Sequence, residues 1–444
     1  MQSNKQEEND KEIVVTERDN TKAIIVGICL DSSLYIKKEE SMKELKLLAD
    51  TAGITVVETL IQRRKKIDRK HYVGKGYIKS ISETMEENKI GLLIFDNELS
   101  PSQGRNILED FKITAIDRTE LILRIFHNHA KSIESRMQVR LAELKYELPR
   151  LKNKWAHFEK QRVAASSKGS AAASRGMGEK QSEIDRRRIK EEISKIERNL
   201  NKVLSQHETQ AKQRNKNFRK MCLVGYTNAG KSTLFNAITE SNVYVKDQLF
   251  ATLDTTTKSV NFGKGRDMII SDTIGFVANL PHHLVASFRA TLKEVLEADL
   301  LLHIVDISDA EFEKHINDVD LVLKHIEADE INQLIVFNKI DVLGENDNRI
   351  SFLKSRFPKA VFISAKNSLH LNDLKKLIDE NLNYSKKHHL LLPHSAQKEI
   401  NRLHILGRIF SKNYVVEGLE VEVELNSDDY RKFEKYEIKQ DNNH

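Results

Sequence analysis

The chain has 444 residues, 39% hydrophobic and 31% charged, enough to form packed cores in about three domains of roughly 150 residues each. Its two cysteines, Cys29 and Cys222, cannot build a disulfide framework, and no apolar run reaches the roughly 18 residues of a membrane-spanning helix. Residues 1–20 are polar and acidic, which predicts a disordered tail and not a signal peptide. This composition argues against secreted, membrane-spanning and fibrous proteins, and we expect a cytoplasmic one.

The formal net charge of +6 is unevenly distributed. The segment from Lys131 to Lys220 holds 24 Lys and Arg against 11 Asp and Glu, a net of +13, which leaves −7 for the other residues. Such a segment favours a polyanionic partner, with nucleic acid as the usual candidate. A solvated helical surface is the alternative, and charge by itself does not decide between them.

Apolar runs and amphipathic patterns alternate through residues 21–118. Strands are predicted at 23–30, 54–60, 91–98 and 112–118, and helices at 38–50, 78–89 and 100–111. The last helix begins with Ser100 as a cap and Pro101 in the first turn. This alternation predicts a domain with a parallel sheet covered by helices on both faces.

Residues 119–218 follow a helical pattern, interrupted by a Gly-, Ser- and Ala-rich stretch at 164–178. The pattern predicts an antiparallel pair of long helices, the second starting at Gln181, joined by a flexible loop. One interpretation is a coiled-coil spacer. The other is that the loop, which carries Lys168, Arg175 and Lys180, contacts a phosphate-rich partner.

Strand–helix alternation returns in residues 219–386, with strands expected at 221–226, 268–276, 299–308, 333–342 and 360–366. It predicts a doubly wound domain. A helix at 395–406 and one half-exposed strand at 415–425 predict a small α+β domain at 387–444. The expected fold class is therefore α/β, with a parallel-sheet domain, a helical hairpin, a doubly wound domain and this small C-terminal domain.

The segment GYTNAGKST (Gly225–Thr233) matches the GxxxxGK[ST] pattern of a phosphate-binding loop between a strand and a helix. Backbone amides of such a loop point at the β- and γ-phosphates. Lys231 would add a positive charge there, and Ser232 would offer a hydroxyl to Mg²⁺. A plain glycine-containing turn is the alternative.

Further segments occur in the order and spacing of a GTPase. In DTIG, Asp272 would hold Mg²⁺ through water and the Gly275 amide would sense the γ-phosphate. In NKID, Asp341 can accept hydrogen bonds from both N1–H and the exocyclic amino group of guanine, a donor pair that adenine lacks. Lys339 would lie over the base and Asn338 would tie its loop to the phosphate loop.

In SAK, the Ala365 amide would meet the guanine O6, and one threonine of FATLDTTTK (Phe250–Lys258) must reach Mg²⁺. These segments define the residues expected to bind nucleotide, which are Gly225, Tyr226, Thr227, Asn228, Ala229, Gly230, Lys231, Ser232, Thr233, Phe250, Ala251, Thr252, Leu253, Asp254, Asp272, Thr273, Ile274, Gly275, Asn338, Lys339, Ile340, Asp341, Ser364, Ala365 and Lys366.

Phe276 stands where Ras-type GTPases carry the glutamine that orients the attacking water. Because phenylalanine cannot orient water, we expect slow intrinsic hydrolysis that a partner stimulates, and no catalytic residue is assigned. Resemblance to other GTPases with an apolar residue at this position implies that Asn228 helps to bind K⁺. The alternative is that Asn228 only closes a hydrogen bond within the loop.

The segments at 96–109, 116–151, 175–189, 225–236, 249–254, 272–276 and 284–306 resemble the HflX family of translational GTPases. The similarity covers about Ala23–Lys386. It implies a GTPase that binds the large ribosomal subunit and whole ribosomes and splits stalled or stress-arrested ribosomes, with the N-terminal domain and helical loop near the peptidyl-transferase centre. It also implies that Thr252 is the threonine that contacts Mg²⁺.

The sequence departs from the family pattern RGPGE in the helical loop, where Met177 replaces proline. The short VGKG segment (Val73–Gly76) could hold a phosphate, and we favour contact with the RNA backbone or a plain turn there over a second nucleotide site. Alternative functions are a ribosome-assembly or RNA-maintenance GTPase, and a signalling switch with a protein effector. We expect a monomer that associates with ribosomes and ribosomal RNA, and peripherally with membrane.

Overall fold

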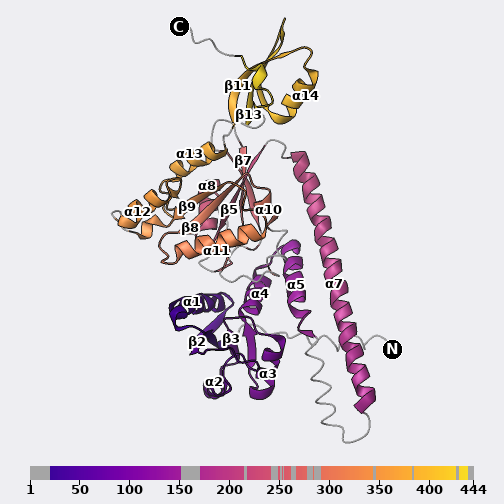
Figure 1. The fold of residues 1–444 in the computed structure, drawn as a ribbon, viewed down its shortest axis with the longest axis vertical. Coiled ribbons are helices and arrows are strands. Elements are labelled where there is room, and N and C mark those ends of the chain that lie inside the picture. The colour runs from indigo at the N-terminus through magenta and orange to yellow at the C-terminus, as the bar shows by residue number, and fades with distance from the viewer. Residues whose placement is uncertain are drawn as a thin grey trace. The chain divides into compact units, whose positions relative to one another are not determined.

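The computed structural model describes residues 21–151, 171–214, 218–241, 249–250, 253, 255–261, 267–277, 284, 292–343, 347–382, 385–426 and 430–438 (Figure 1). The chain forms two compact units. The first contains the residues up to Gln206 together with Asp247–Leu253 and Ala278–Phe288, and the second contains the others. Each unit has its own buried core around a sheet, which is parallel in the first unit and mostly parallel in the second. No helix in the described ranges is long and apolar enough to cross a membrane.

The first unit begins with a four-stranded parallel sheet in the order β2-β1-β3-β4. Its elements are β1 (Thr21–Cys29), α1 (Tyr35–Thr51), β2 (Ile54–Arg63), α2 (Lys75–Glu87), β3 (Leu92–Phe95), α3 (Pro101–Phe111) and β4 (Thr114–Asp117). Ile24, Leu93 and Phe95 of the strands are fully buried, as expected for a sheet that helices cover. The predicted α/β class is confirmed.

The start of α3 shows why the sequence forms a helix there. Ser100 accepts a hydrogen bond from the Gln103 backbone N–H, and the Gln103 side chain in turn accepts one from the Ser100 N–H. Pro101 occupies the first turn, where its missing N–H costs nothing. The predicted cap and first-turn proline are confirmed.

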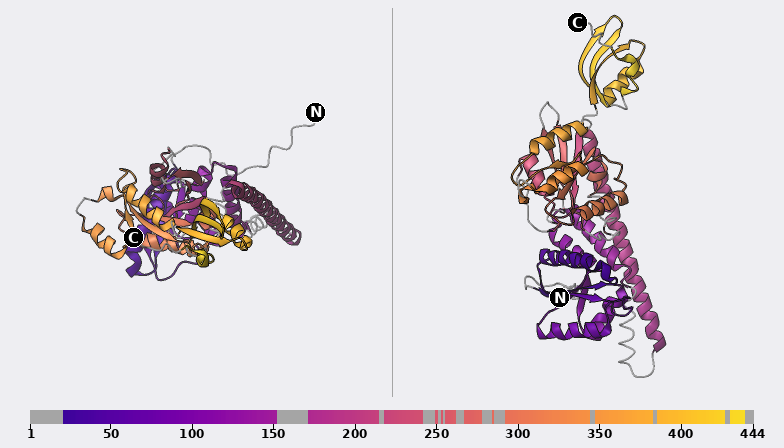
Figure 2. Two further views of the ribbon diagram at one scale, coloured as in Figure 1. Left: turned by 90° about the horizontal axis from the view of Figure 1, so that it is seen from above. Right: turned by 60° about the vertical axis from the view of Figure 1, so that its left-hand side comes forward.

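Three helices follow: α4 (Arg118–His129), α5 (Ile133–Glu147) and α7 (Ala171–Arg214), the long helix seen from two sides in Figure 2. Leu141 and Leu144 of α5 pack with Ile193 and Leu200 of α7. Ion pairs of 3.0 Å join Arg140 to Glu192 and Lys145 to Glu197 across the same contact. Apolar spacing and charge pairing thus hold α5 and α7 together.

The predicted flexible loop at 164–178 is wrong for its second half, because α7 begins at Ala171 and not at Gln181. Three consecutive alanines, Ala171–Ala173, have the highest helix propensity and outweigh Gly176 and Gly178. The first half of that stretch lies outside the described residues.

The second unit contains a six-stranded sheet in the order β10-β9-β8-β5-β7-β6. Its strands are β5 (Arg219–Gly225), β6 (Thr256–Asn261), β7 (Asp267–Asp272), β8 (Leu300–Asp306), β9 (Gln333–Asn338) and β10 (Val361–Phe362), and its helices are α8 (Lys231–Thr239), α10 (Lys293–Leu296), α11 (Phe312–His325), α12 (Asn348–Arg356) and α13 (Leu371–Leu382). All five predicted strands are confirmed. Strand β6 was not predicted, and it pairs antiparallel with β7 at the sheet edge.

The C-terminal residues form the antiparallel sheet β11-β13-β12 with one helix. Its elements are β11 (Ser385–Pro393), α14 (Gln397–Leu406), β12 (Arg408–Val415) and β13 (Gly418–Asn426). The strand predicted at 415–425 is confirmed as β13 from Gly418 onward, but its start is wrong, because Val415 ends β12 and the chain turns at Val416–Glu417. A side chain at Gly418 would meet the Leu392 carbonyl oxygen at 2.1 Å, so this turn brings β13 close to β11 only with glycine there.

Candidate nucleotide-binding site

The phosphate-binding loop lies between β5 and α8 at the carboxyl edge of the six-stranded sheet. Gly225, Asn228 and Gly230 have positive φ angles of 149°, 61° and 92°. A Cβ at Gly225 would meet the Ile304 carbonyl oxygen at 2.3 Å, and one at Gly230 would meet the Asn338 Nδ2 at 2.2 Å. Glycine is therefore needed at both positions for the loop to turn over the start of the helix.

Lys231 is the first residue of α8, and its amine folds back into this loop. Nζ donates hydrogen bonds to the carbonyl oxygens of Tyr226 at 2.7 Å and Gly225 at 3.1 Å. Burial lowers the pKa of Lys231 to about 8, although nearby Asp272 acts in the opposite direction. Two neutral carbonyls hold the buried amine at the place where the phosphates of a nucleotide would balance its charge.

Nucleotide affinity is expected to fall as the pH rises above about 8. The pKa of Lys231 is low in the free protein, whereas bound phosphate favours the charged amine and raises that pKa. The affinity for nucleotide is therefore greatest below the pKa that Lys231 has in the free protein. Above that pKa it falls by up to about tenfold per pH unit, until the pH passes the higher pKa that Lys231 has in the complex.

Calorimetric titration with GDP between about pH 7 and about pH 9.5, in two buffers of different ionisation enthalpy, measures the proton uptake that this linkage requires. Binding that consumes no proton at the alkaline end of the range would contradict the expected protonation of Lys231.

Two oxygen groups lie together beside the loop. The Ser232 hydroxyl donates to Asp272 Oδ2 at 2.6 Å, and Asp272 is fully buried at the end of β7. Hydroxyl and carboxylate oxygens are the hard ligands that Mg²⁺ prefers, so this pair fits Mg²⁺ with Ser232 in direct contact and Asp272 acting through water. Among the described residues no three His, Cys, Asp or Glu side chains cluster as a metal site, so phosphate oxygens and water would complete the coordination.

The DTIG segment continues from β7 onto the phosphate loop. The Phe276 N–H donates to the Gly225 carbonyl oxygen at 3.1 Å, and the Thr227 N–H donates to the Phe276 carbonyl oxygen at 2.7 Å. The Phe276 side chain is 3% exposed. Buried and apolar, it has no group that could orient a water molecule.

The predicted switch segment is only partly described. Phe250 and Leu253 are buried, and the Phe250 ring packs edge-on against Phe126 of α4 with 4.7 Å between ring centroids. Ala251, Thr252 and Asp254 lie outside the described residues. The contact of Thr252 with Mg²⁺ therefore stays a prediction.

Two of the other candidate threonines belong to the sheet. Thr256 and Thr257 lie in β6, where Thr256 pairs with Asp272 and Thr257 with Ser271. The hydroxyl oxygens of Thr257 and Ser271 are 3.1 Å apart. This side-chain contact and the strand pairing account for Thr257 without a ligand.

Asn338 joins three segments that are far apart in the sequence. Its side-chain Nδ2 donates to the Ala229 carbonyl oxygen at 2.9 Å, and its Oδ1 accepts from the Ala365 N–H at 2.9 Å. The tie between NKID and the phosphate loop is present as expected. The Ala365 N–H was expected to meet the guanine O6, but in this structure it is engaged by the Asn338 side chain instead. One side-chain amide therefore links the phosphate loop to the NKID and SAK segments.

The residues predicted to bind the base lie at the ends of β9 and β10. Lys339 has a φ of 66°, and its Nζ pairs with Asp306 at 2.7 Å. Asp341 is exposed in the short helix Ile340–Val342 and available to a ligand. Ser364 is fully buried, and its hydroxyl accepts from the Asn367 N–H at 3.1 Å.

Replacing Asp341 by asparagine is expected to weaken GTP and GDP by roughly 10- to 100-fold and to leave folding intact. The change keeps one acceptor but removes the charge and one of two hydrogen bonds to guanine, and a hydrogen bond to a charged group contributes about 1.5–3 kcal/mol. Fluorescence titration with guanine and xanthine nucleotides measures the effect. The side-chain amide that Asp341→Asn introduces can donate to the extra carbonyl of xanthine, so unchanged preference for guanine would argue against this role of Asp341.

A cationic loop in the first unit was missed by the sequence analysis, which counted charge only over long segments. Arg63, Lys65, Lys66 and Arg69 are exposed, and none has an acidic partner among the described residues. At the base of this loop Asp68 accepts hydrogen bonds from the backbone N–H groups of Lys70 at 2.8 Å and His71 at 2.9 Å. The run RRKKIDRK would have shown this cluster in a count over short windows.

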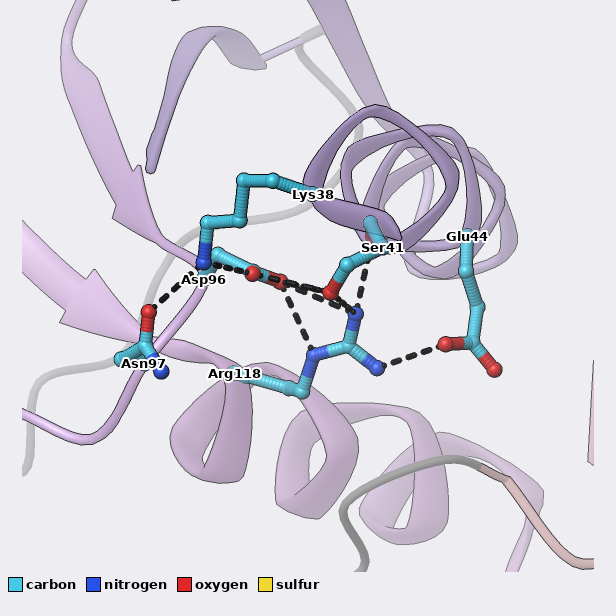
Figure 3. A network of polar contacts seen from close by, with 6 residues as sticks. All are labelled: Lys38, Ser41, Glu44, Asp96, Asn97 and Arg118. Atoms are coloured by element: carbon cyan, nitrogen blue, oxygen red, sulfur yellow. Dashed lines mark hydrogen bonds and ion pairs between the residues drawn. The ribbon is translucent and has the colours of Figure 1, made fainter. Parts of the chain in front are cut away.

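Charged side chains also fill the carboxyl edge of the N-terminal sheet (Figure 3). Asp96 follows β3 and is 5% exposed; it accepts from Lys38 Nζ at 2.5 Å and Arg118 Nη2 at 2.9 Å. Arg118 also donates to Glu44 at 2.9 Å, and the Ser41 hydroxyl donates to Asp96 at 2.9 Å. Open α/β sheets often bind ligands where the strand order reverses, as it does between β1 and β3. In this protein that position holds two cations, Lys38 and Arg118, which pair with the carboxylates of Asp96 and Glu44.

Three features on a mostly parallel sheet define a P-loop GTPase: the loop that carries Lys231, the hydrogen-bonded pair of Ser232 and Asp272, and the Asn338 bridge from NKID to the phosphate loop. Sequence models of three families agree: "GTP-binding GTPase N-terminal" matches residues 39–127, "GTP-binding GTPase Middle Region" matches 129–214, and "50S ribosome-binding GTPase" matches 220–339.

Proteins named GTPase HflX are similar over most of the chain. The one from Alkalihalophilus pseudofirmus is 40% identical, over 88% of this chain and 89% of the relative. The one from Escherichia coli is 38% identical, over 87% of each. A crystal structure of a GTP-binding protein from Sulfolobus solfataricus in complex with GDP covers 81% of this chain and 98% of that chain, with 22% identity and a TM-score of 0.42. This chain belongs to the HflX family and is a GTP-hydrolysing enzyme.

Proposed function

We propose that this GTPase binds the large ribosomal subunit and whole ribosomes in the cytoplasm and splits stalled or stress-arrested ribosomes into subunits. The observation that carries the proposal is the match of residues 220–339 to a family described as "50S ribosome-binding GTPase". The similarity to proteins named GTPase HflX over most of the chain supports it. GTP binding would bring Thr252 to Mg²⁺, and hydrolysis would release it.

The charge distribution supports an RNA partner. On α7, Arg188, Lys190, Lys195 and Lys202 are exposed, and no described acidic residue pairs with them. The acidic residues Glu192 and Glu197 instead pair with α5, as described above, so they do not neutralise that surface. The cationic loop at 63–69 adds a second surface suited to phosphates.

K⁺ is proposed as a second cation of the site, beside Mg²⁺. Asn228 is exposed at a φ of 61°, and its side chain makes no hydrogen bond with the described residues. This leaves its amide oxygen available to a cation and argues against the alternative of a loop-closing hydrogen bond. K⁺ there would place positive charge between the β- and γ-phosphates, and GTP turnover should then be faster in K⁺ than in Na⁺.

Sedimentation of whole ribosomes after incubation with the protein tests the proposal. Subunits should appear when GTP is present, and fewer should appear with GDP. Large subunits should also raise the rate of GTP turnover, which is expected to be slow in the isolated protein because Phe276 cannot orient water. Ribosomes that stay intact in every nucleotide state and salt concentration would refute splitting. Binding to large subunits without splitting would select an assembly or RNA-maintenance role.

Two variants separate the RNA contact from nucleotide binding. Replacing Arg188, Lys190, Lys195 and Lys202 by glutamine should leave GDP affinity unchanged and reduce the salt dependence of ribosome binding, since fewer counterions are released. Lys324→Gln with Lys359→Gln, at two exposed lysines elsewhere, is the matched control.

Deleting Lys168–Lys180 should likewise spare GTP binding and impair splitting. Ribonuclease-resistant capture of a non-ribosomal protein would favour a signalling role.

A further inference from the structure

Asp306, the last residue of β8, belongs to none of the predicted nucleotide-binding motifs, yet its carboxylate holds the lysine of NKID. Asp306 Oδ2 pairs with Lys339 Nζ at 2.7 Å, and the two side chains are 19% and 28% exposed. Strands β8 and β9 are neighbours in the sheet, with Asp306 opposite Asn338 in the register (Figure 1). The pair therefore links the end of one strand to the first residue after the next.

The two oxygens of the Asp306 carboxylate have separate partners. Oδ1 accepts hydrogen bonds from the Ser308 N–H at 2.9 Å and from the Ser308 hydroxyl at 2.6 Å, which closes the turn after β8. Oδ2 pairs with Lys339. The turn thus fixes the carboxylate in the orientation in which it meets the lysine.

The backbone of Lys339 also limits where its side chain can lie. Its φ of 66° is in the left-handed region, which residues other than glycine adopt infrequently. The Ile307 N–H donates to the Asn338 carbonyl oxygen at 3.1 Å, so the peptide that precedes Lys339 is tied to the residue that follows Asp306. Because its backbone and its amine are both held, the methylene groups between them are ordered before any ligand binds.

We propose that Asp306 is a positioning residue for guanine binding, which holds Lys339 so that the methylene groups of its side chain lie against the base. The base is neutral and does not draw Nζ away from its carboxylate, so the contact with the ring is made by the apolar part of the lysine. A side chain that is ordered in advance raises affinity, because binding no longer has to immobilise it. The inference rests on the predicted contact of Lys339 with guanine and not on any ribosomal partner.

The competing explanation is that Asp306 only closes the turn after β8. Asp306→Asn separates the two explanations, because the amide keeps an acceptor for Ser308 and loses the charge that holds Lys339. Ser308→Ala removes a hydroxyl from the turn and leaves the Asp306–Lys339 pair in place. Asp329→Asn, at an exposed aspartate before β9, is the matched control for the loss of one negative charge.

Affinities of the full-length protein for GDP and for the non-hydrolysable GTP analogue GMPPNP, measured by calorimetry, test the proposal. Asp306→Asn should bind both about 2- to 12-fold more weakly, and by the same factor because they carry the same base. Lys339→Ala should bind them about 10- to 100-fold more weakly, since the methylene contact is lost. Adding Asp306→Asn to Lys339→Ala should change affinity by no more than about 1.5-fold, and so should each control by itself.

An Asp306→Asn protein that binds GDP like the unaltered protein would overturn the proposal. So would an equal loss with and without Lys339, or an equal loss in Ser308→Ala, because either would show that Asp306 supports the turn. A Lys339→Ala protein with unchanged GDP affinity would refute the predicted base contact and, with it, the role of Asp306. Thermal unfolding shows that each variant is folded, and none of these results bears on ribosome splitting.

Discussion

Replacing Lys231 by alanine is expected to lower the affinity for both GTP and GDP by about 30- to 5,000-fold. The amine is buried among the carbonyl oxygens of Gly225 and Tyr226, at the place where phosphate oxygens would approach. Removing one partner of a buried, hydrogen-bonded charge pair costs about 2–5 kcal/mol, which corresponds to that range. Calorimetric titration of both nucleotides measures the loss.

The matched control is Lys359→Ala, at an exposed lysine of the same unit, which should bind both nucleotides normally. Thermal unfolding without nucleotide shows that the Lys231→Ala protein is folded. Because burial disfavours the charged amine and its hydrogen-bond acceptors are neutral backbone oxygens, removing Lys231 should not destabilise the nucleotide-free fold. A Lys231→Ala protein that keeps GDP affinity within about threefold would exclude Gly225–Thr233 as the phosphate-binding loop.

Replacing Asp96 by alanine is expected to lower the free energy of unfolding of the N-terminal domain by about 3–5 kcal/mol. The substitution leaves Lys38 and Arg118 inside the protein without their shared carboxylate (Figure 3). Breaking a buried ion pair by removing one partner costs this much because a buried charge remains uncompensated. Denaturant unfolding monitored by hydrogen exchange of β1 and β3 measures the loss in this part of the chain.

The effect of Asp96→Ala depends on pH in a defined direction. Burial acts to raise the pKa of Asp96, but Arg118 and Lys38 outweigh it, so the pKa lies below its ordinary value. The stabilisation is then complete above the ordinary aspartate pKa and is lost as the pH falls through the lowered one. The difference between the two proteins should shrink in acid, and a difference that grows there would contradict this assignment.

A matched variant, Asp50→Ala, removes an exposed aspartate from the last turn of α1. It should change the free energy of unfolding by no more than about 0.5 kcal/mol. If Asp96→Ala is equally mild, the network in Figure 3 does not hold the edge of the sheet together.

Most of the elements were predictable from local pattern. The strands that enclose the phosphate loop are short apolar runs, and a buried parallel strand needs nothing else to be identified. The cap at Ser100 was predictable because its partner, Gln103, is three residues away. Errors occurred where local preferences compete. Alanines extend α7 into a glycine-containing stretch that was predicted as a loop. A turn at Val416–Glu417 separates β12 from β13, although the alternating pattern of residues 415–425 predicted one strand.

The order of the motifs in the chain predicted which residues bind a guanine nucleotide, because the binding groups of each motif lie within a few residues of one another. Only the tertiary structure decided what lies between them. The Asn338 bridge spans 109 residues to Ala229, and the charged network joins Lys38 to Asp96 across 58. Such contacts form between side chains that the fold brings together from distant positions in the chain. The local sequence therefore does not predict which polar groups pair and which stay unpaired.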